Sequence, residues 1–194
     1  MKRLLPLVLA LFATPAFAHL PPGEYGSFAA GISHPLFGLD HILAMVAVGL
    51  WASQLGGRAL WAVPAAFVSV MVLGFVLAIA GLPLPFVEPM ILASTVVLGL
   101  VVAMAVRTEI WVGAALVGLF ALFHGHAHGG ELGDAGALRF GIGFALATAA
   151  LHAAGIGLGL WVGRLGARLG GTGAILPRGL GALTALAGLG LAFG

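Results

Sequence analysis

Residues 59–80 read ALWAVPAAFVSVMVLGFVLAIA, an apolar run without a charged side chain. A helix needs about 20 such residues to cross the hydrocarbon core of a bilayer. Comparable runs recur along the chain with short breaks between them. We expect six spanning helices, at residues 35–54, 59–80, 86–106, 109–128, 137–163 and 174–193. The sequence therefore predicts an all-α polytopic membrane helix bundle.

The composition also indicates a membrane protein, because 61% of the 194 residues are hydrophobic and only 7% are charged. Soluble domains carry about 25% charged residues. Eight lysines and arginines are too few for a nucleic-acid-binding surface, so we expect a lipid bilayer and no nucleic acid as partner. Cysteine is absent, which excludes disulfides and thiolate metal ligands.

The N-terminus has the pattern of an export signal. A lysine and an arginine precede the apolar run 4–12, and the sequence AFA at 16–18 matches an A-x-A cleavage site. We expect residues 1–18 to be cleaved as a signal peptide, with a short uncleaved anchor as the alternative. Residues 19–194 then form one six-helix transmembrane domain whose N-terminus is periplasmic.

Basic residues between the predicted spans fix the orientation. The connections expected on the inner side hold Arg58, Arg107, Arg164 and Arg168, whereas the outer side keeps Arg139 beside two acidic residues. Lysine and arginine are enriched in cytoplasmic loops. We therefore expect a multi-pass inner-membrane protein with both termini in the periplasm.

Two groups of polar residues interrupt the apolar pattern. The first is HPLFGLDH at residues 34–41. If the helix extends back to His34, then His34 and His41 are seven residues apart and share one face. Asp40 and His41 are expected roughly two turns inside the membrane. Asp40 is either a metal ligand or a hydrogen-bond partner that fixes the tautomer of His41.

The second group is FHGHAHGGE at residues 123–131. His124 and His128 are four residues apart and Glu131 follows three residues later, so a helical backbone places all three on one stripe. His126 points away from that stripe if the helix continues. The glycines permit this helix end to unwind where its backbone lines a wet cavity.

The predicted topology brings both groups to the external face of the membrane. Ionisable side chains within a membrane are costly, and they usually face a cavity or one another. If the first and fourth spans are neighbours, four histidines and two carboxylates can converge on one divalent ion. Such donors suit nickel, cobalt, zinc or copper(II), and ligand type alone does not choose among these ions. The candidate metal ligands are His34, Asp40, His41, His124, His128 and Glu131.

Three further histidines are secondary candidates for metal binding. Cleavage after residue 18 would make His19 the first mature residue, whose α-amine and imidazole can chelate a metal together. A terminus without fixed structure is the alternative. His152 lies near the middle of the fifth span and is either a packing residue or a ligand deeper along the path. His126 is a spare contact rather than a core ligand.

At these residues the sequence resembles the HupE/UreJ family of nickel and cobalt permeases. Residues 34–54, HPLFGLDHILAMVAVGLWASQ, are similar to the family's first-span signature. Residues 123–131 match its Phe-His-Gly-x-Ala-His-Gly-x-Glu pattern, in which His126 fills the variable position. The signal peptide and the six spans also fit, so the resemblance covers essentially the whole chain. It implies a transporter that takes up nickel or cobalt as substrate, often for hydrogenase or urease maturation.

The residues leave other functions open. An intramembrane metal-dependent hydrolase could use the same histidines and carboxylates, with zinc activating a water molecule. A bis-histidine haem carrier and a metal sensor that does not transport are two more alternatives. The chain lacks a nucleotide-binding loop of the type G-x-x-x-x-G-K-[ST], so we expect no ATP hydrolysis by this chain.

Overall fold

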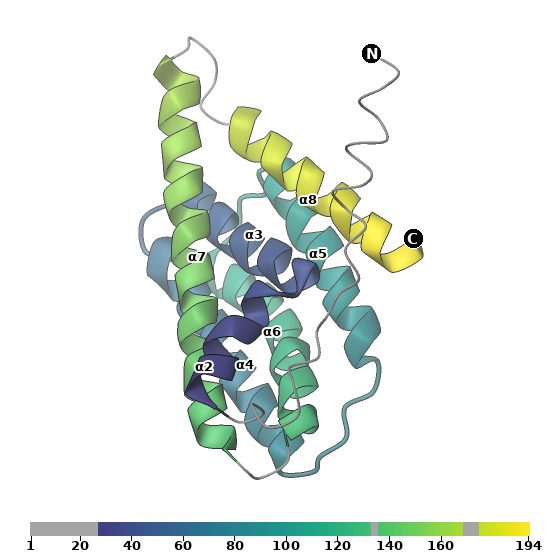
Figure 1. The fold of residues 1–194 in the computed structure, drawn as a ribbon. Coiled ribbons are helices and arrows are strands. Elements are labelled where there is room, and N and C mark those ends of the chain that lie inside the picture. Colours follow the sequence, from purple (N-terminus) through teal and green to yellow (C-terminus); the bar gives the residue numbers. More distant parts are fainter. Residues whose placement is uncertain (1–26, 133–135, 169–174) are drawn as a thin grey trace.

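The computed structural model describes residues 27–132, 136–168 and 175–194. The predicted signal peptide at 1–18 and His19 lie outside these residues. The described part of the chain is helical and contains no strand (Figure 1). Its elements are α2 Phe28–Ser33, η1 His34–Leu36, α3 Leu39–Leu55, α4 Ala59–Ile79, α5 Val87–Ala103, α6 Ile110–Leu132, α7 Ala137–Arg168 and α8 Ile175–Phe193.

Helix length and composition confirm a multi-pass membrane protein. Four helices, α4, α6, α7 and α8, are long and apolar enough to cross a bilayer. A fifth crossing results if α2, η1 and α3 together form one broken span. Helix α5 is apolar but has only 17 residues. The described residues thus contain four or five such spans, where the sequence predicts six.

The first predicted span is broken by a bend of 82° between η1 and α3. Gly38 has an extended backbone (φ −87°, ψ 115°) and caps the start of α3, whereas Pro35 lies in the 3-10 turn before it. The condition for placing His34 and His41 on one helix face, a helix that extends back to His34, is therefore not met. Asp40 and His41 lie in the first turn of α3, not two turns inside a longer helix.

The helices pack mainly in pairs: α4 with α6, α5 with α8, and α7 with both α3 and α2. Figure 1 shows α7 running along one side of the bundle, with α2 and α3 against it. Glycines allow the close approach, because small residues let helix backbones touch. A Cβ atom at Gly155 of α7 would overlap the carbonyl oxygen of Val46 of α3, and one at Gly99 of α5 would overlap the backbone of Ala185 of α8.

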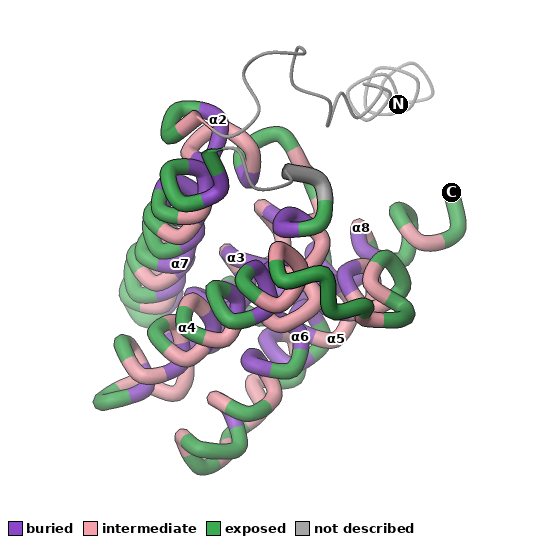
Figure 2. The backbone as a smooth tube through the Cα atoms, turned by 90° about the horizontal axis from the view of Figure 1, so that it is seen from below, coloured by how far each residue is buried: buried purple, intermediate pink, exposed green. Residues whose placement is uncertain are grey.

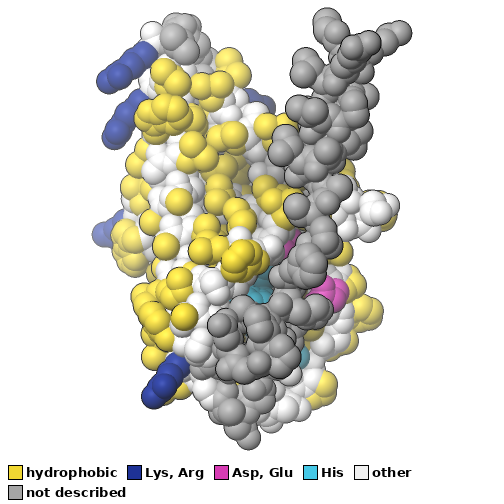
Figure 3. Space-filling view, viewed as in Figure 1, with side chains coloured by type: hydrophobic (Ala, Val, Ile, Leu, Met, Phe, Trp, Pro, Cys, Tyr) yellow, Lys and Arg dark blue, Asp and Glu magenta, His cyan; other side chains and the backbone are white. Residues whose placement is uncertain are grey.

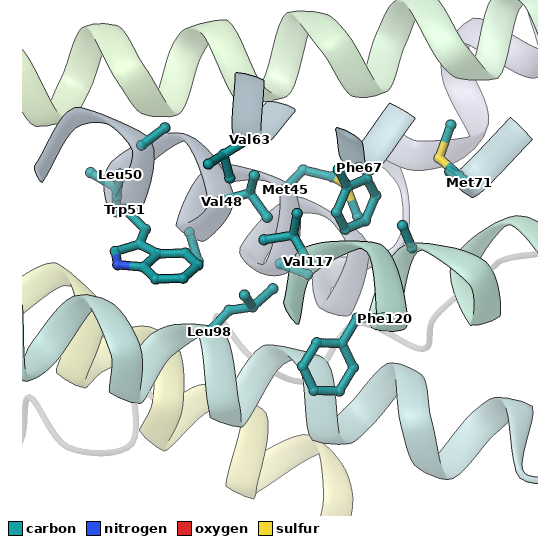
Figure 4. Packing of buried hydrophobic residues seen from close by; sticks show 14 of the residues in the cluster. Met45, Val48, Leu50, Trp51, Val63, Phe67, Met71, Leu98, Val117 and Phe120 are labelled. Carbon is teal, nitrogen blue, oxygen red and sulfur yellow. The ribbon is translucent and has the colours of Figure 1, made fainter. Parts of the chain in front are cut away.

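Helix α3 occupies the centre of the bundle, where Met45, Val48 and Trp51 are at most 1% exposed. Figure 4 shows these side chains packed with those of the surrounding helices. Burial follows the inward faces of the helices, and the outward faces are exposed (Figure 2). Large apolar side chains such as Trp111 and Leu183 lie on those outward faces, and apolar side chains cover much of the face in Figure 3. This pattern suits a bundle whose solvent is lipid.

Candidate metal centre

The second histidine group lies on an unbroken helix. Helix α6 continues through residue 132, so its glycines do not unwind this end of the helix. His124 and His128 are one turn apart, and they are 0% and 9% exposed. The glycines serve packing instead: Cβ atoms at Gly125 and Gly129 would overlap the carbonyl oxygens of Met71 and Phe75 on α4.

Three imidazole rings meet at His41, which is 4% exposed. The Nε2 atom of His41 lies 3.3 Å from Nδ1 of His124 and 3.2 Å from Nε2 of His128. Helices α3 and α6 are not among the closely packed helix pairs of the described chain. The space between their backbones accommodates the three rings, so the two histidine groups of the sequence meet through side chains.

His34 joins the same cluster from the other side of the bend. Its ring lies edge-on to that of His128, with 4.4 Å between the ring centroids. Two phenylalanines of α7 flank the group: Phe144 lies 4.8 Å from the His128 ring and 5.7 Å from the His41 ring, and Phe140 lies 5.7 Å from the His34 ring. Four histidines thus share one site that is largely enclosed by apolar side chains.

The hydroxyl of Ser94 on α5 is hydrogen-bonded to His124. The Ser94 hydroxyl donates its hydrogen to the carbonyl oxygen of Ile91, 2.6 Å away. The same hydroxyl oxygen lies 2.8 Å from Nε2 of His124, and it accepts a hydrogen bond from that nitrogen when its own hydrogen is on Ile91. A neutral imidazole has one N–H and one lone pair. In that tautomer, Nδ1 of His124 presents its lone pair to His41.

Hydrogen bonds alone do not satisfy this cluster. The Nε2 atom of His41 has either one hydrogen or one lone pair, but it faces nitrogen atoms of both His124 and His128. If His41 forms a hydrogen bond with one of these two histidines, its Nε2 atom has no hydrogen or lone pair left for the other. Nδ1 of His128 is also buried without a partner. Buried polar groups are nearly always paired, so these nitrogens are candidates for binding a cation that accepts several lone pairs.

The nitrogen spacing is compatible with coordination. Imidazole nitrogens bind zinc at about 2.0–2.1 Å, so two of them at a tetrahedral angle around one ion are about 3.3 Å apart. In the described residues no group of three or more His, Asp or Glu side chains is already arranged to hold a metal ion. Binding would thus require at least one ring of the cluster to rotate.

Of the two candidate carboxylate ligands, the structure describes the side chain of Asp40 but not that of Glu131. Asp40 is half-buried in the first turn of α3. Its Oδ1 atom lies near Gly38, 2.8 Å from where a Cβ would stand there, and its backbone carbonyl accepts a 3.4 Å hydrogen bond from Thr95. Negative charge is favourable at a helix N-terminus. Glu131 lies near the end of α6, but its side chain is outside the described part.

The two remaining described histidines lie apart from the cluster. His126 points away from the stripe, as predicted, and its Nε2 atom donates a 2.8 Å hydrogen bond to the carbonyl oxygen of Leu82. This bond attaches the segment after α4 to α6. His152 of α7 is 1% exposed, and neither of its ring nitrogens has a hydrogen-bond partner.

Sequence reasoning missed the serine that orients His124. The available signal was the polar pair Ser94-Thr95 within the apolar run of α5, because a buried hydroxyl requires a partner. Phe144 was missed as well, since an aromatic residue in an apolar helix carries no signal of its own.

Ser94→Ala is expected to weaken metal binding by about 10–100-fold, because the ring of His124 loses the hydrogen-bond partner that holds its orientation. Ser53→Ala is the matched control, because the Ser53 hydroxyl donates only to a carbonyl of its own helix. Titration of the two purified variants with Co²⁺, followed by absorption, measures the difference. Equal affinities would remove the orienting role of Ser94.

Apolar spanning helices around buried, incompletely paired imidazoles define a multi-pass membrane protein with a candidate site for a divalent metal ion. The family model described as HupE / UreJ protein matches residues 7–191. Over 188 residues the chain is 48% identical to Protein HupE of Rhizobium leguminosarum bv. viciae, an alignment that covers 96% of this chain and 95% of that protein. No solved structure matches the chain. The chain belongs to the HupE/UreJ family.

Proposed function

We propose that this protein takes up nickel or cobalt across the bacterial inner membrane and that His41, His124 and His128 bind the ion near the outer face. One observation carries the proposal: Nδ1 of His124 and the Nε2 atoms of His41 and His128 meet inside an apolar bundle, where hydrogen bonding leaves them incompletely paired. Neutral nitrogen donors without thiolate suit these borderline ions. The two signature segments of the family favour nickel and cobalt over zinc and copper.

The proposed topology has six crossings. Helices α2, η1 and α3 form one broken span and α5 a short one, and they add to the four long helices. Non-helical backbone at membrane depth is tolerated where protein covers it, as α7 covers the bend after η1. With residues 1–18 removed as a signal peptide, both termini of the domain 19–194 are periplasmic. The excess of arginine in the expected inner connections supports this orientation.

Uptake begins with capture and partial dehydration of the ion at the outer cluster. His34 contributes a fourth imidazole, and Asp40 and Glu131 offset the positive charge. The mature N-terminal His19 is a further donor in this proposal. The metal is the transported substrate and not a resident cofactor. A hydrogenase or urease maturation system is the proposed consumer of the ion inside the cell.

Uptake of radiolabelled nickel and cobalt by cells tests the proposal. A variant with both His34→Ala and His124→Ala is expected to lose at least about 90% of the uptake, because the cluster loses two of its four imidazoles. Its abundance in the membrane, measured by immunoblot, should remain normal. His126→Gln is the matched control, since His126 binds a carbonyl oxygen outside the cluster. Normal uptake by the double variant would leave these histidines as structural residues.

Proteoliposomes separate transport from the alternative of an intramembrane metal-dependent hydrolase. Purified protein is expected to move Ni²⁺ or Co²⁺ into vesicles without hydrolysing their phospholipid. Fluorescence of a metal-sensitive dye inside the vesicles reports flux, and mass spectrometry of the lipid reports hydrolysis. Lipid turnover without metal flux would favour the hydrolase.

A further inference from the structure

We propose that His152 and Thr148 of α7 form a second, inner binding site at which the ion pauses after leaving the outer histidine cluster. This inference rests on metal transport as the function. It assigns a ligand pair and a route within the bundle, and it is argued from groups that the outer site does not use.

Both side chains are buried without partners. His152 is 1% exposed and Thr148 is 0% exposed. Both ring nitrogens of His152 lack a hydrogen-bond partner, and so does the hydroxyl oxygen of Thr148. Such groups are rare in folded proteins, because burial removes their bonds to water without replacement. Three polar atoms left unpaired in two neighbouring side chains therefore indicate that something polar binds there.

The two residues lie on one face of α7, since they are four residues apart. The same stripe begins one turn earlier with Phe144, whose ring contacts those of His41 and His128. Each step of four residues advances about 6 Å along a helix, so His152 lies about 12 Å further along the axis than Phe144. Because α7 runs inward in the proposed topology, the stripe leads from the outer cluster toward the middle of the bundle.

One apolar ring separates the outer cluster from the inner pair. Phe67 of α4 is 0% exposed. Its ring centroid lies 5.8 Å from that of His124 and 5.0 Å from that of His152, the latter edge-on. In the proposed route, this side chain would rotate to let the ion pass from the outer cluster to the inner pair.

The ligand count suits a passing ion. The outer site offers four imidazoles, whereas the inner site offers one imidazole and one hydroxyl. Conduction requires sites that bind strongly enough to admit an ion and weakly enough to release it. An inner site with fewer strong donors meets that condition for Ni²⁺ or Co²⁺, whose outer ligands are also imidazoles.

The test compares binding with flux in purified protein, using Co²⁺ as the probe. His152→Phe and Thr148→Val remove the polar atoms but keep similar shapes. Thr184→Val on α8 is the matched control, because Thr184 is buried and its hydroxyl donates to the carbonyl oxygen of Leu180. Absorption bands of bound Co²⁺ report the outer site, and entry of Co²⁺ into proteoliposomes reports transport.

His152→Phe is expected to keep the Co²⁺ spectrum and an affinity within about three-fold of wild type, while initial flux falls at least about ten-fold. Thr148→Val should slow flux by several-fold, and Thr184→Val should leave it unchanged. If His152→Phe does not fold, Thr148→Val and His152→Gln are used instead to compare Co²⁺ binding with Co²⁺ flux. Wild-type flux in the folded variants would overturn the inner site, as would parallel losses of binding and flux. A wild-type protein that neither binds nor moves Co²⁺ would instead refute the proposed function.

Discussion

His41→Ala is expected to lower the affinity for Ni²⁺ and Co²⁺ at least about 100-fold, because removing a ligand costs at least as much as removing a group that orients one. The Nε2 atom of His41 is the point to which nitrogens of both His124 and His128 are close. Its removal leaves those two rings on one stripe of α6 without their common partner. Uptake should fall with binding, since the proposed function places the entry of the ion at this cluster.

Titration calorimetry of the purified variant, with Co²⁺ absorption as a second readout, measures this loss. His126→Gln serves as the control on the helix that carries His124 and His128, since its hydrogen bond to the carbonyl oxygen of Leu82 lies outside the cluster. Helical content from circular dichroism should be the same in both variants. If His41→Ala bound metal as tightly as wild type, the ion would have to bind elsewhere.

Gly125→Ala is expected to destabilise the protein by at least about 3 kcal/mol, the upper range for forcing extra atoms into a packed core. A Cβ atom at this position would overlap the carbonyl oxygen of Met71, and this atom belongs to the backbone of α4. Backbone cannot rotate away as a side chain can. Helices α4 and α6 would therefore have to move apart, and the stripe with His124 and His128 would move with α6.

Gly130→Ala on the same helix is the matched control, because nothing lies within 4 Å of a Cβ added there. Alanine is the better helix former, so this change should be neutral or stabilise the protein by up to about 1 kcal/mol. Thermal unfolding in detergent and abundance in the membrane measure both variants. Similar melting temperatures for the two variants would contradict the role assigned to Gly125.

Much of the fold is readable from the chain because hydropathy is a local property. Helix α4 spans Ala59–Ile79, close to the predicted 59–80, and α8 spans Ile175–Phe193, close to the predicted 174–193. The first span was predicted less well. An apolar run does not reveal where a glycine takes an extended conformation, and Gly38 breaks the helix there.

The sequence likewise predicted one part of the candidate site, and the other part depends on how the helices pack. The i, i+4 spacing of His124 and His128 specifies a stripe on any helix, so the sequence alone predicted that both face one side. That they face His41 depends on contacts over 83 and 87 residues of sequence. The orientation of His124 by Ser94 and the unpaired nitrogens of His152 likewise depend on how separate helices pack.

The sequence by itself determined the membrane class, the approximate limits of most helices, the family and the residues that bear imidazole and carboxylate groups. These follow from hydropathy, helical periodicity and short motifs, each of which is encoded within a few turns of chain. Only the tertiary structure decided which nitrogens lie within 3.3 Å of one another, which glycines bring α4 and α6 together, and which polar atoms are left without partners. Those features arise from packing between helices distant in sequence, where the position of each side chain depends on the shapes of all its neighbours.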